Sequence, residues 1–390
     1  MIRRALDFIR QNDIDWGIFG FIAGYHIVLA IALPVYLVLG APTVALLVTT
    51  LVVFTATMMS ITMGYHRLFS HRTFEAAGIV EWLLVFVGSL TLQGSIVKWS
   101  HDHRLHHKYV DREGDPYGTQ LGFWHSHVLW LFKRQAPINE SLVKDLLRDP
   151  VVRSQHEHYF VWAIGSNVLV SVAAGLALGD LWGAVIFVFL LRLFLAHHGT
   201  WFINSIAHIW GSRPYSTEHS AVNNFVIALL TYGEGYHNYH HTFAGDYRNG
   251  IKWYHFDPSK HAIWLLSKIG LTRNLKRVGD LTIKKRLVAA DRSLLLDHLS
   301  AVAHESAEAY RARIEQTSKR VDDASHAFAA RINELREAAE VYRAARQARR
   351  RDEIKAAKAR INAVRAQVQV EWKAWQRLCA EVLAVEPVRA

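Results

Sequence analysis

Long apolar stretches separated by polar, basic segments dominate the first two thirds of the chain. Four of them are long enough for membrane-spanning helices, because a bilayer core needs about 20 apolar residues per helix. They lie at about 17–39, 43–65, 160–178 and 181–203. The pattern therefore predicts an all-α integral membrane protein, with four transmembrane helices in two hairpins.

Lysine and arginine placement predicts the orientation of these helices. Arg3, Arg4 and Arg10 precede the first span, and the long connection between the second and third spans is basic, whereas the turns 40–43 and 179–180 carry neither residue. Since cytoplasmic loops carry an excess of Lys and Arg, we expect both termini and the large loop in the cytoplasm.

A fifth apolar stretch, at about 79–97, carries Glu81 and Gln93 near its ends. A single crossing here would place His66 and His71 on the opposite membrane face from His103. The metal site inferred below from the histidine clusters needs these residues on one face. We therefore expect an interfacial or re-entrant segment shielded by protein. A cytoplasmic helical cap on the four spans would hold a histidine-rich site.

The C-terminal part, residues 281–390, differs from the membrane domain predicted for residues 1–280. No glycine or proline occurs from Asp280 to Glu386, which predicts long helix. Apolar residues at coiled-coil spacing form two runs, one from Phe328 to Tyr342 and one from Ile354 to Trp375. A coiled coil or helical hairpin is the first interpretation, and a basic amphipathic helix on anionic lipid is the alternative.

Composition changes this picture in two ways. The single cysteine, Cys379, excludes a disulfide scaffold and a cysteine-based metal site, while 23 histidines among 390 residues point to metal, since neutral imidazole is a common ligand. The net charge of +11 suits anionic lipid or an acidic protein partner. We expect no nucleic-acid partner.

Histidines cluster at the predicted cytoplasmic ends of the spans. Residues at i, i+3 and i+4 share one face of a helix, so each of two His-x-x-His-His clusters can present its rings to one site. Asn204 and His208 also share a face, whereas His66 and His71 would lie about 140° apart on a straight helix, so we expect the helix to end or kink between them. The candidate ligands are His66, His71, His103, His106, His107, Asn204, His208, His237, His240 and His241.

Nine imidazoles are too many for one ion, so we predict two ions that keep open positions for an oxidant. All-imidazole ligation suits iron, copper, zinc or nickel. The chain lacks the pair of Glu-x-x-His motifs that the soluble carboxylate di-iron bundle requires, which excludes that bundle.

The segments around these clusters resemble the three histidine boxes of membrane acyl-CoA desaturases of the stearoyl-CoA desaturase type. The similar segments are Gly64-Tyr-His-Arg-Leu-Phe-Ser-His-Arg-Thr-Phe74, Trp99-Ser-His-Asp-His-Arg-Leu-His-His-Lys108 and Gly233-Glu-Gly-Tyr-His-Asn-Tyr-His-His-Thr-Phe243. The resemblance covers about residues 15–280.

The resemblance implies a di-iron enzyme that uses O₂ and two electrons to place a cis double bond, usually at carbon 9, in a long saturated acyl chain. The nine histidines would bind the two irons, and Asn204 would bind through a water. No catalytic group beyond these ligands is implied. Trp99 and Thr200 match residues that shape the bend of the family's acyl tunnel.

The resemblance also bears on partners. Asp102, Lys133 and Arg134 match residues that contact coenzyme A, but Gly94 and His101 stand where the family has Asn and Arg. We therefore favour acyl-CoA over a glycerolipid-linked or carrier-protein-linked chain. The run Asp111-Arg-Glu-Gly-Asp-Pro116 also resembles bacterial and plastid desaturases, some of which act on lipid-linked chains. We expect a bacterial inner-membrane protein. Because the chain has no dinucleotide or haem motif, a ferredoxin, rubredoxin or cytochrome b5 with its reductase would supply electrons.

Two alternatives remain open at this point. A histidine-box hydroxylase would insert oxygen instead of removing a second hydrogen, and the sequence separates it poorly from a desaturase. A histidine-rich metal transporter would place ionisable residues along a path inside the spans.

Overall fold

The computed structural model describes residues 13–306 and 308–387, so the orientation argument from Arg3, Arg4 and Arg10 lies outside the described residues. The chain forms two compact units. The first contains the described residues up to 213 and residues 218–277, and the second contains residues 214–217 and the chain from Val278 onward.

Four helices of the first unit are long and apolar enough to cross a membrane, which confirms the predicted all-α membrane architecture. Two of the four contain π-helical turns, and these two run farther than predicted, to Ser70 and His208. In order they are α2 (Trp16–Leu39), α3 (Val44–Met59) continued by η1 (Ser60–Ser70), α9 (Tyr159–Leu178), and α10 (Leu181–Gly183) continued by η5 (Ala184–Leu191), α11 (Arg192–Asn204) and η6 (Ile206–His208).

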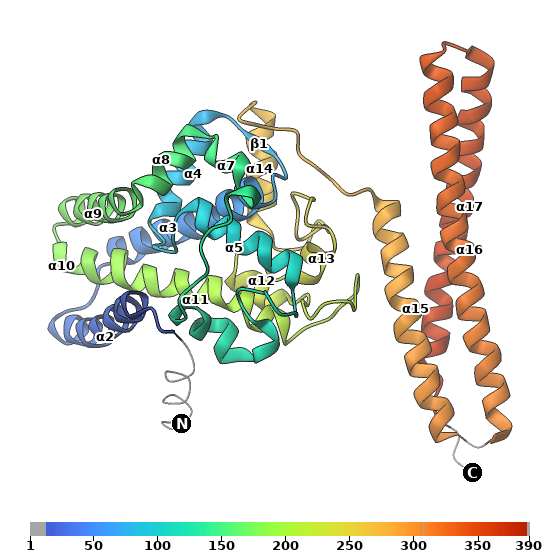
Figure 1. Ribbon diagram of the computed structural model, residues 1–390, viewed down its shortest axis with the longest axis horizontal. Helices are drawn as coiled ribbons and strands as arrows, with labels where there is room; N and C mark the ends of the chain where they lie inside the picture. The colour runs from blue at the N-terminus through green and yellow to red at the C-terminus, as the bar shows by residue number, and fades with distance from the viewer. Residues whose placement is uncertain (1–12, 307, 388–390) are drawn as a thin grey trace. The chain divides into compact units, whose positions relative to one another are not determined.

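Side-chain caps fix where these helices begin. Asp15 accepts hydrogen bonds from the backbone of Gly17 (3.0 Å) and Ile18 (3.1 Å) at the start of α2. Asp180 accepts from Gly183 N at the start of α10 (2.7 Å) and from the Tyr36 hydroxyl on α2 (2.5 Å). The turn between the last two spans is thereby tied to the first span, and α2 packs against η5 (Figure 1).

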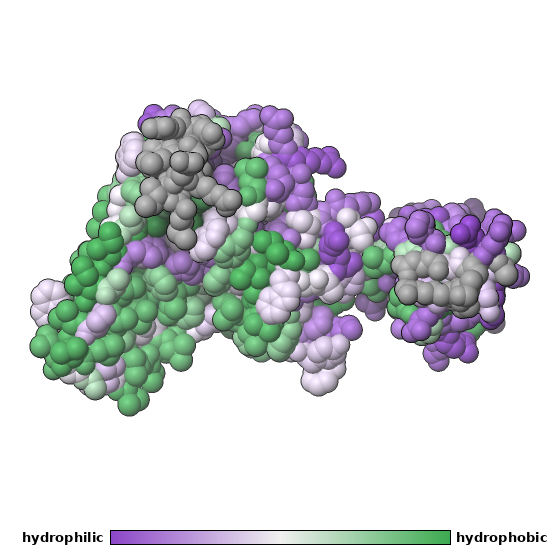
Figure 2. All heavy atoms as spheres, turned by 90° about the horizontal axis from the view of Figure 1, so that it is seen from below, coloured by the Kyte–Doolittle hydropathy of each residue, from purple (hydrophilic) through white to green (hydrophobic). Residues whose placement is uncertain are grey.

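The spans expose apolar side chains outward, as lipid contact requires. Figure 2 shows hydrophobic residues covering the end of this unit where α2, α9 and α10 lie. Val38, Leu39, Phe160 and Trp182 are each more than 70% exposed. The arrangement is the reverse of a soluble protein and agrees with a surface solvated by acyl chains.

The fifth apolar stretch is not one helix. It comprises α4 (Gly78–Ser89), a loop, and the start of α5 (Ile96–Tyr109). Twelve residues of helix rise about 18 Å, which is too short to cross a core of about 30 Å. α4 packs so tightly on η1 that a Cβ at Gly88 would overlap the Tyr65 ring.

Short elements complete the part of the first unit that carries the two His-x-x-His-His clusters. The two-residue strands pair in antiparallel fashion. The elements are β1 (Glu75–Ala76), η2 (Thr119–Leu121), η3 (His125–Leu129), α6 (Trp130–Phe132), η4 (Glu140–Leu142), α7 (Lys144–Leu147), α8 (Pro150–Glu157), α12 (Phe225–Leu230), α13 (His237–Thr242), α14 (Pro258–Lys268) and β2 (Thr272–Arg273).

The C-terminal unit is a bundle of three long helices, α15 (Asp280–Glu305), α16 (Glu308–Gln347) and α17 (Arg351–Leu383), which lie side by side in Figure 1. Its own core buries Leu299, Val321 and Val368 completely. Both predicted apolar runs face this core, so the coiled-coil interpretation fits and the apolar faces are not left for lipid. No residue pattern predicts the break at Arg349, which turns the chain with φ of 55° although it is not glycine.

We predict that Leu299→Ala destabilises the C-terminal unit by about 2–5 kcal/mol, because it leaves a cavity in the helical core. Leu294→Ala is the matched control, since Leu294 lies on the same helix and is 48% exposed. Thermal unfolding of residues 278–390, followed by circular dichroism, measures both. Equal losses for the two variants would contradict the core described here.

Candidate metal centre

All nine predicted histidines lie together, in two groups. Within each group one ring nitrogen per residue lies within 4.8 Å of the others. The first histidine group is His66, His71, His103, His107 and His240, and the second histidine group is His106, His208, His237 and His241. Segments far apart in the chain therefore meet at one place.

The helices α5 and α13 each contribute to both groups, which corrects the expectation that each His-x-x-His-His cluster serves a single site. His103 and His107 on α5 join the first group, but His106 joins the second. On α13, His240 joins the first group and His237 the second. The reason is geometric, because consecutive residues of a helix point about 100° apart.

The helix ends between His66 and His71, as their spacing predicts. η1 is a π-helix that ends at Ser70 with His71 as its C-cap, and His71 N donates to His66 O (3.1 Å). An i→i+5 turn is wider than an α-turn, so it brings residues five apart onto one side. The two rings lie 4.9 Å apart between centroids and belong to the same group.

Ring nitrogens converge more closely than imidazoles alone can satisfy. In the first group the Nε2 atoms of His66 and His107 each lie 2.9 Å from Nε2 of His240. A neutral imidazole has one donor and one acceptor, so a shared set of Nε2 lone pairs needs a cation. In the second group, buried His106 Nε2 has no hydrogen-bond partner. The donor set therefore fits two metal ions.

Oxygen atoms behind three of the rings hold them in the ligating tautomer. Glu234 Oε2 lies 2.8 Å from His66 Nδ1, and Asp115 Oδ1 lies 2.8 Å from His106 Nδ1. Ionised carboxylates only accept, so Nδ1 carries the proton and Nε2 keeps its lone pair.

His208 is oriented through a hydroxyl. Its Nδ1 lies 2.8 Å from Ser220 Oγ, which donates to Asp111 Oδ1 (2.5 Å). The spacing of the histidines does not reveal that Glu234, Ser220 and Asp111 support the ligand rings. For Glu234 a signal existed, because it stands between two glycines directly before the third box.

Burial keeps the ligand rings neutral. It is the main cause that lowers the pKa of His103, His107 and His240 well below the usual value, and the neighbouring histidines add to it. Burial is the largest single influence on the pKa of Asp115 and would raise it, but His106 together with hydrogen bonds from Tyr117 and Thr119 outweighs burial, so the pKa is lowered. Neutral rings beside ionised carboxylates are the state that binds a metal cation.

A buried ion-pair network joins the first box to the third. The Arg67 guanidinium lies 3.0 Å from Glu234 and 2.9 Å from Asp257, and all three side chains are at most 2% exposed. Asp257 also accepts from the backbone of Asn249 and Gly250. Because Glu234 also contacts His66, the network sets the distance between η1 and the segment that leads into α13.

A cavity of about 190 Å³ lies beside the first histidine group. Trp99, Thr200, Asn204 and Asp102 line it, and the Trp99 ring stacks on His103 with centroids 4.9 Å apart. Gln93 donates to the Thr200 hydroxyl across one wall (3.0 Å). The structure thus places four predicted site residues around one hollow, and one of them, Trp99, contacts the candidate ligand His103.

Asn204 reaches this place differently from the prediction. α11 ends at Asn204, and His208 follows in the tighter helix η6, so the two do not share a continuous α-helical face. Asn204 lines the cavity, and His208 belongs to the second histidine group.

The predicted coenzyme contacts are only partly brought together. Asp102 lines the cavity and pairs with Lys98, which also lines it and which the sequence analysis missed. Lys133 and Arg134 are not among the lining residues, and Arg134 pairs with exposed Asp13 (3.3 Å). His197 and His198 lie outside both histidine groups, as do His101, His125 and His127.

Comparison with known proteins agrees with this geometry. The fatty acid desaturase family matches residues 41–267, which include all nine histidines. The chain belongs to the fatty acid desaturase family. α15–α17 lie outside the matched residues.

Three relatives of this family member illustrate the similarity. It is 40% identical over 277 residues to a probable acyl-CoA desaturase of Schizosaccharomyces pombe, covering 69% of this chain and 58% of the relative. It is 37% identical over 233 residues to acyl-CoA desaturase 1 of Saccharomyces cerevisiae, covering 59% and 46%. It is 34% identical over 230 residues to an sn-2 palmitoyl-lipid 9-desaturase of Nostoc sp., covering 56% and 76%. The chain thus spans about half the length of the two fungal relatives.

We predict that Asp115→Asn weakens iron binding about 10–100-fold, because His106 loses the charged acceptor that orients its ring. Iron retained in competition with a chelator measures the effect. Asp322→Asn, in the C-terminal unit, is the control and should retain iron like the unaltered chain. An Asp115→Asn variant that also holds its iron as tightly would show that this carboxylate does not support the site.

Proposed function

We propose that the protein desaturates a long saturated fatty acyl chain at a di-iron centre, with O₂ as oxidant. The observation that carries the proposal is the pair of histidine groups, five and four rings, beside a cavity whose wall residue Trp99 stacks on His103. Membership of the fatty acid desaturase family supports it.

The reaction needs a metal oxidant because an unactivated CH₂ has no acidic proton for a side-chain base to remove. Two bound irons would supply the oxidising power for hydrogen abstraction. Two hydrogens from adjacent carbons, two electrons and two protons together reduce O₂ to two waters. The side chains of this protein would bind the acyl chain, hold one carbon pair beside the metals and keep bulk water out.

The cavity suits an acyl chain that enters from a polar end. Lys98, Asp102 and Gln135 form a polar part of its lining, whereas Ile18, Phe21 and Leu131 form an apolar part. We propose that the carboxyl end lies at the polar part and that Trp99 and Thr200 bend the chain beside the first histidine group. A double bond at carbon 9 is the expected product, as the name of the Nostoc relative indicates for that protein.

Acyl-CoA is the proposed carrier, because the two fungal relatives are named acyl-CoA desaturases. A lipid-linked chain is the alternative, and the name of the Nostoc relative favours it. An external one-electron carrier, such as ferredoxin, rubredoxin or cytochrome b5, would supply the electrons. We place the histidine groups on the cytoplasmic side, following the lysine and arginine distribution of the loops; a bacterial inner membrane stays a prediction.

We predict that a host lacking its own desaturase gains a monounsaturated acyl chain when it expresses this protein. His106→Ala and His240→Ala should abolish the gain, since each removes a ligand from a different histidine group. His261→Ala is the control, because His261 is exposed on α14. Mass spectrometry of total fatty acids measures the product, and immunoblotting of membranes confirms that each variant accumulates.

The mass of the product also separates a desaturase from a hydroxylase. A loss of 2 Da identifies desaturation, whereas a gain of 16 Da would identify a hydroxylase. Unchanged fatty acids in the presence of accumulated protein and a working electron donor would reject the proposal.

A further inference from the structure

Buried polar side chains from the membrane spans converge on one loop, Leu90–Gly94, which joins α4 to α5. Arg192 Nη1 on α11 donates to Leu90 O (2.5 Å). Asn167 Nδ2 on α9 donates to the same carbonyl (3.3 Å). His197 Nε2 on α11 must donate to Thr91 O (2.7 Å), because a carbonyl only accepts.

These side chains are costly where they lie. Ionisable groups inside membrane spans are rare and mark function, because burying them away from water is unfavourable. Arg192 is fully buried, and its remaining donors reach Val188 O (3.1 Å) and Asn167 Oδ1. His197 also accepts from the Tyr25 hydroxyl on α2 (2.8 Å). Three spans thus hold this one loop through side chains that belong to neither histidine group.

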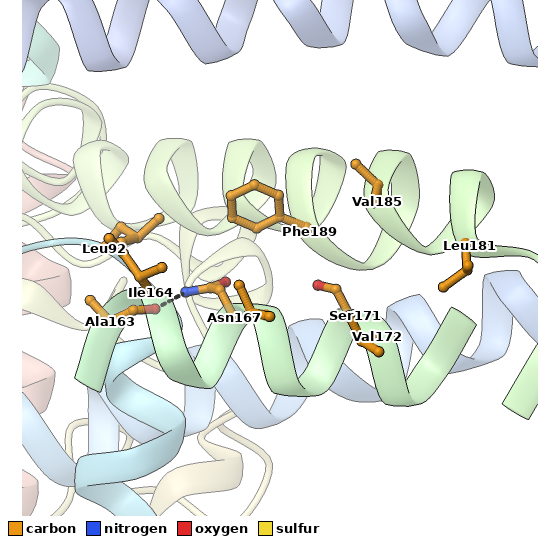
Figure 3. Close-up of a pocket in the computed structure, with 10 residues that line it drawn as sticks. Leu92, Ala163, Ile164, Asn167, Ser171, Val172, Leu181, Val185 and Phe189 are labelled. Carbon is orange, nitrogen blue, oxygen red and sulfur yellow. Dashed lines mark hydrogen bonds between the residues drawn. The ribbon is translucent and has the colours of Figure 1, made fainter. Parts of the chain in front are cut away.

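The loop forms a wall between two hollows. Leu92 lines the cavity beside the metal centre and also a groove of about 380 Å³ between α9 and η5. Figure 3 shows Leu92 at one end of this groove, near Ala163 and Ile164, with Leu181 at the other end. The side chain of Leu92 therefore separates the cavity from a groove that runs along the spans.

The loop holds a conformation that leucine does not favour. Leu92 has φ of 51°, in the left-handed region where a β-carbon is crowded. The next two residues are bonded outward, Gln93 to Thr200 and Gly94 N to the Tyr159 hydroxyl (3.0 Å). Such a conformation persists only where the surroundings impose it, and such sites cluster at functional positions.

We propose that Arg192, Asn167 and His197 are positioning residues that fix the Leu90–Gly94 loop and thereby determine which pair of acyl carbons is desaturated. The inference rests on the proposed function. When an acyl chain slides along the cavity by one methylene, it exchanges one apolar contact for a nearly identical one. Binding alone therefore favours one position of the chain over the next by only about 10–200-fold. If the Leu90–Gly94 loop moved by more than about 0.5 Å, the preference for one chain position would be lost.

The test compares two neighbouring histidines in the full chain, expressed in a host lacking a desaturase. His197→Leu removes the bond to Thr91, and we expect the share of product with a shifted double bond to rise roughly tenfold. His198→Leu is the matched control, since His198 bonds to His26 and His127 and not to the loop; it should give the isomers of the unaltered chain. Mass spectrometry after derivatising the double bond measures the positions.

Two further variants separate positioning from a general loss of structure. His197→Gln keeps an amide donor for Thr91 and should restore the original isomer in part. Leu92→Gly removes the wall side chain at a backbone conformation that glycine adopts freely, so it spares the fold and should shift isomers even where His197→Leu does not accumulate.

Two outcomes distinguish this inference from the proposed function. Unchanged isomers in both His197→Leu and Leu92→Gly, with product still formed, would overturn the positioning role alone. An unaltered chain that makes no unsaturated product would overturn the proposed function and this inference with it.

Discussion

The structure depends on nine neutral imidazoles that face each other in a space without bulk water. Such rings repel one another when protonated and leave lone pairs unsatisfied when neutral, so their convergence is stable only around cations. Two conditions keep them in place. Burial lowers the pKa values of His103, His107 and His240, and carboxylates behind His66 and His106 fix the orientation of those two rings. The Arg67 network then sets the spacing between the first and third boxes.

The membrane spans serve this centre as a scaffold and as a source of polar contacts. Their outer faces are apolar, but their inner faces carry Arg192, Asn167 and His197, which bond to a single loop beside the cavity. Trp99 connects the two systems, because it lines the cavity and stacks on His103. The proposed metal binding and the proposed acyl-chain positioning are thus joined through one helix, α5.

Much of this could be predicted from the sequence, for identifiable reasons. The length of an apolar stretch predicts a membrane span, because a bilayer core needs about 20 apolar residues per helix. The spacing of histidines predicts metal ligands, because residues at i+3 and i+4 share a helix face. The division of His106 and His107 between groups escaped, because it depends on where a second helix lies. The helix end between His66 and His71 could be predicted, but the π-helical form of η1 (Ser60–Ser70) could not, because backbone widening has no residue signature here.

Other features depended on tertiary contacts that spacing does not reveal. Glu234 and Asp115 gain their role from rings that are distant or on another element. The turn at Arg349 lacks glycine and proline, since burial of the helical core outweighs the local backbone preference. Lys133 and Arg134 were predicted to contact coenzyme A only from the family resemblance. The structure does not place them on the cavity lining.

The most direct measurement is anomalous diffraction at the iron edge from crystals of the iron-loaded protein. The account predicts two iron peaks, one among the five rings of the first histidine group and one among the four of the second. A single peak, or peaks away from these rings, would contradict it.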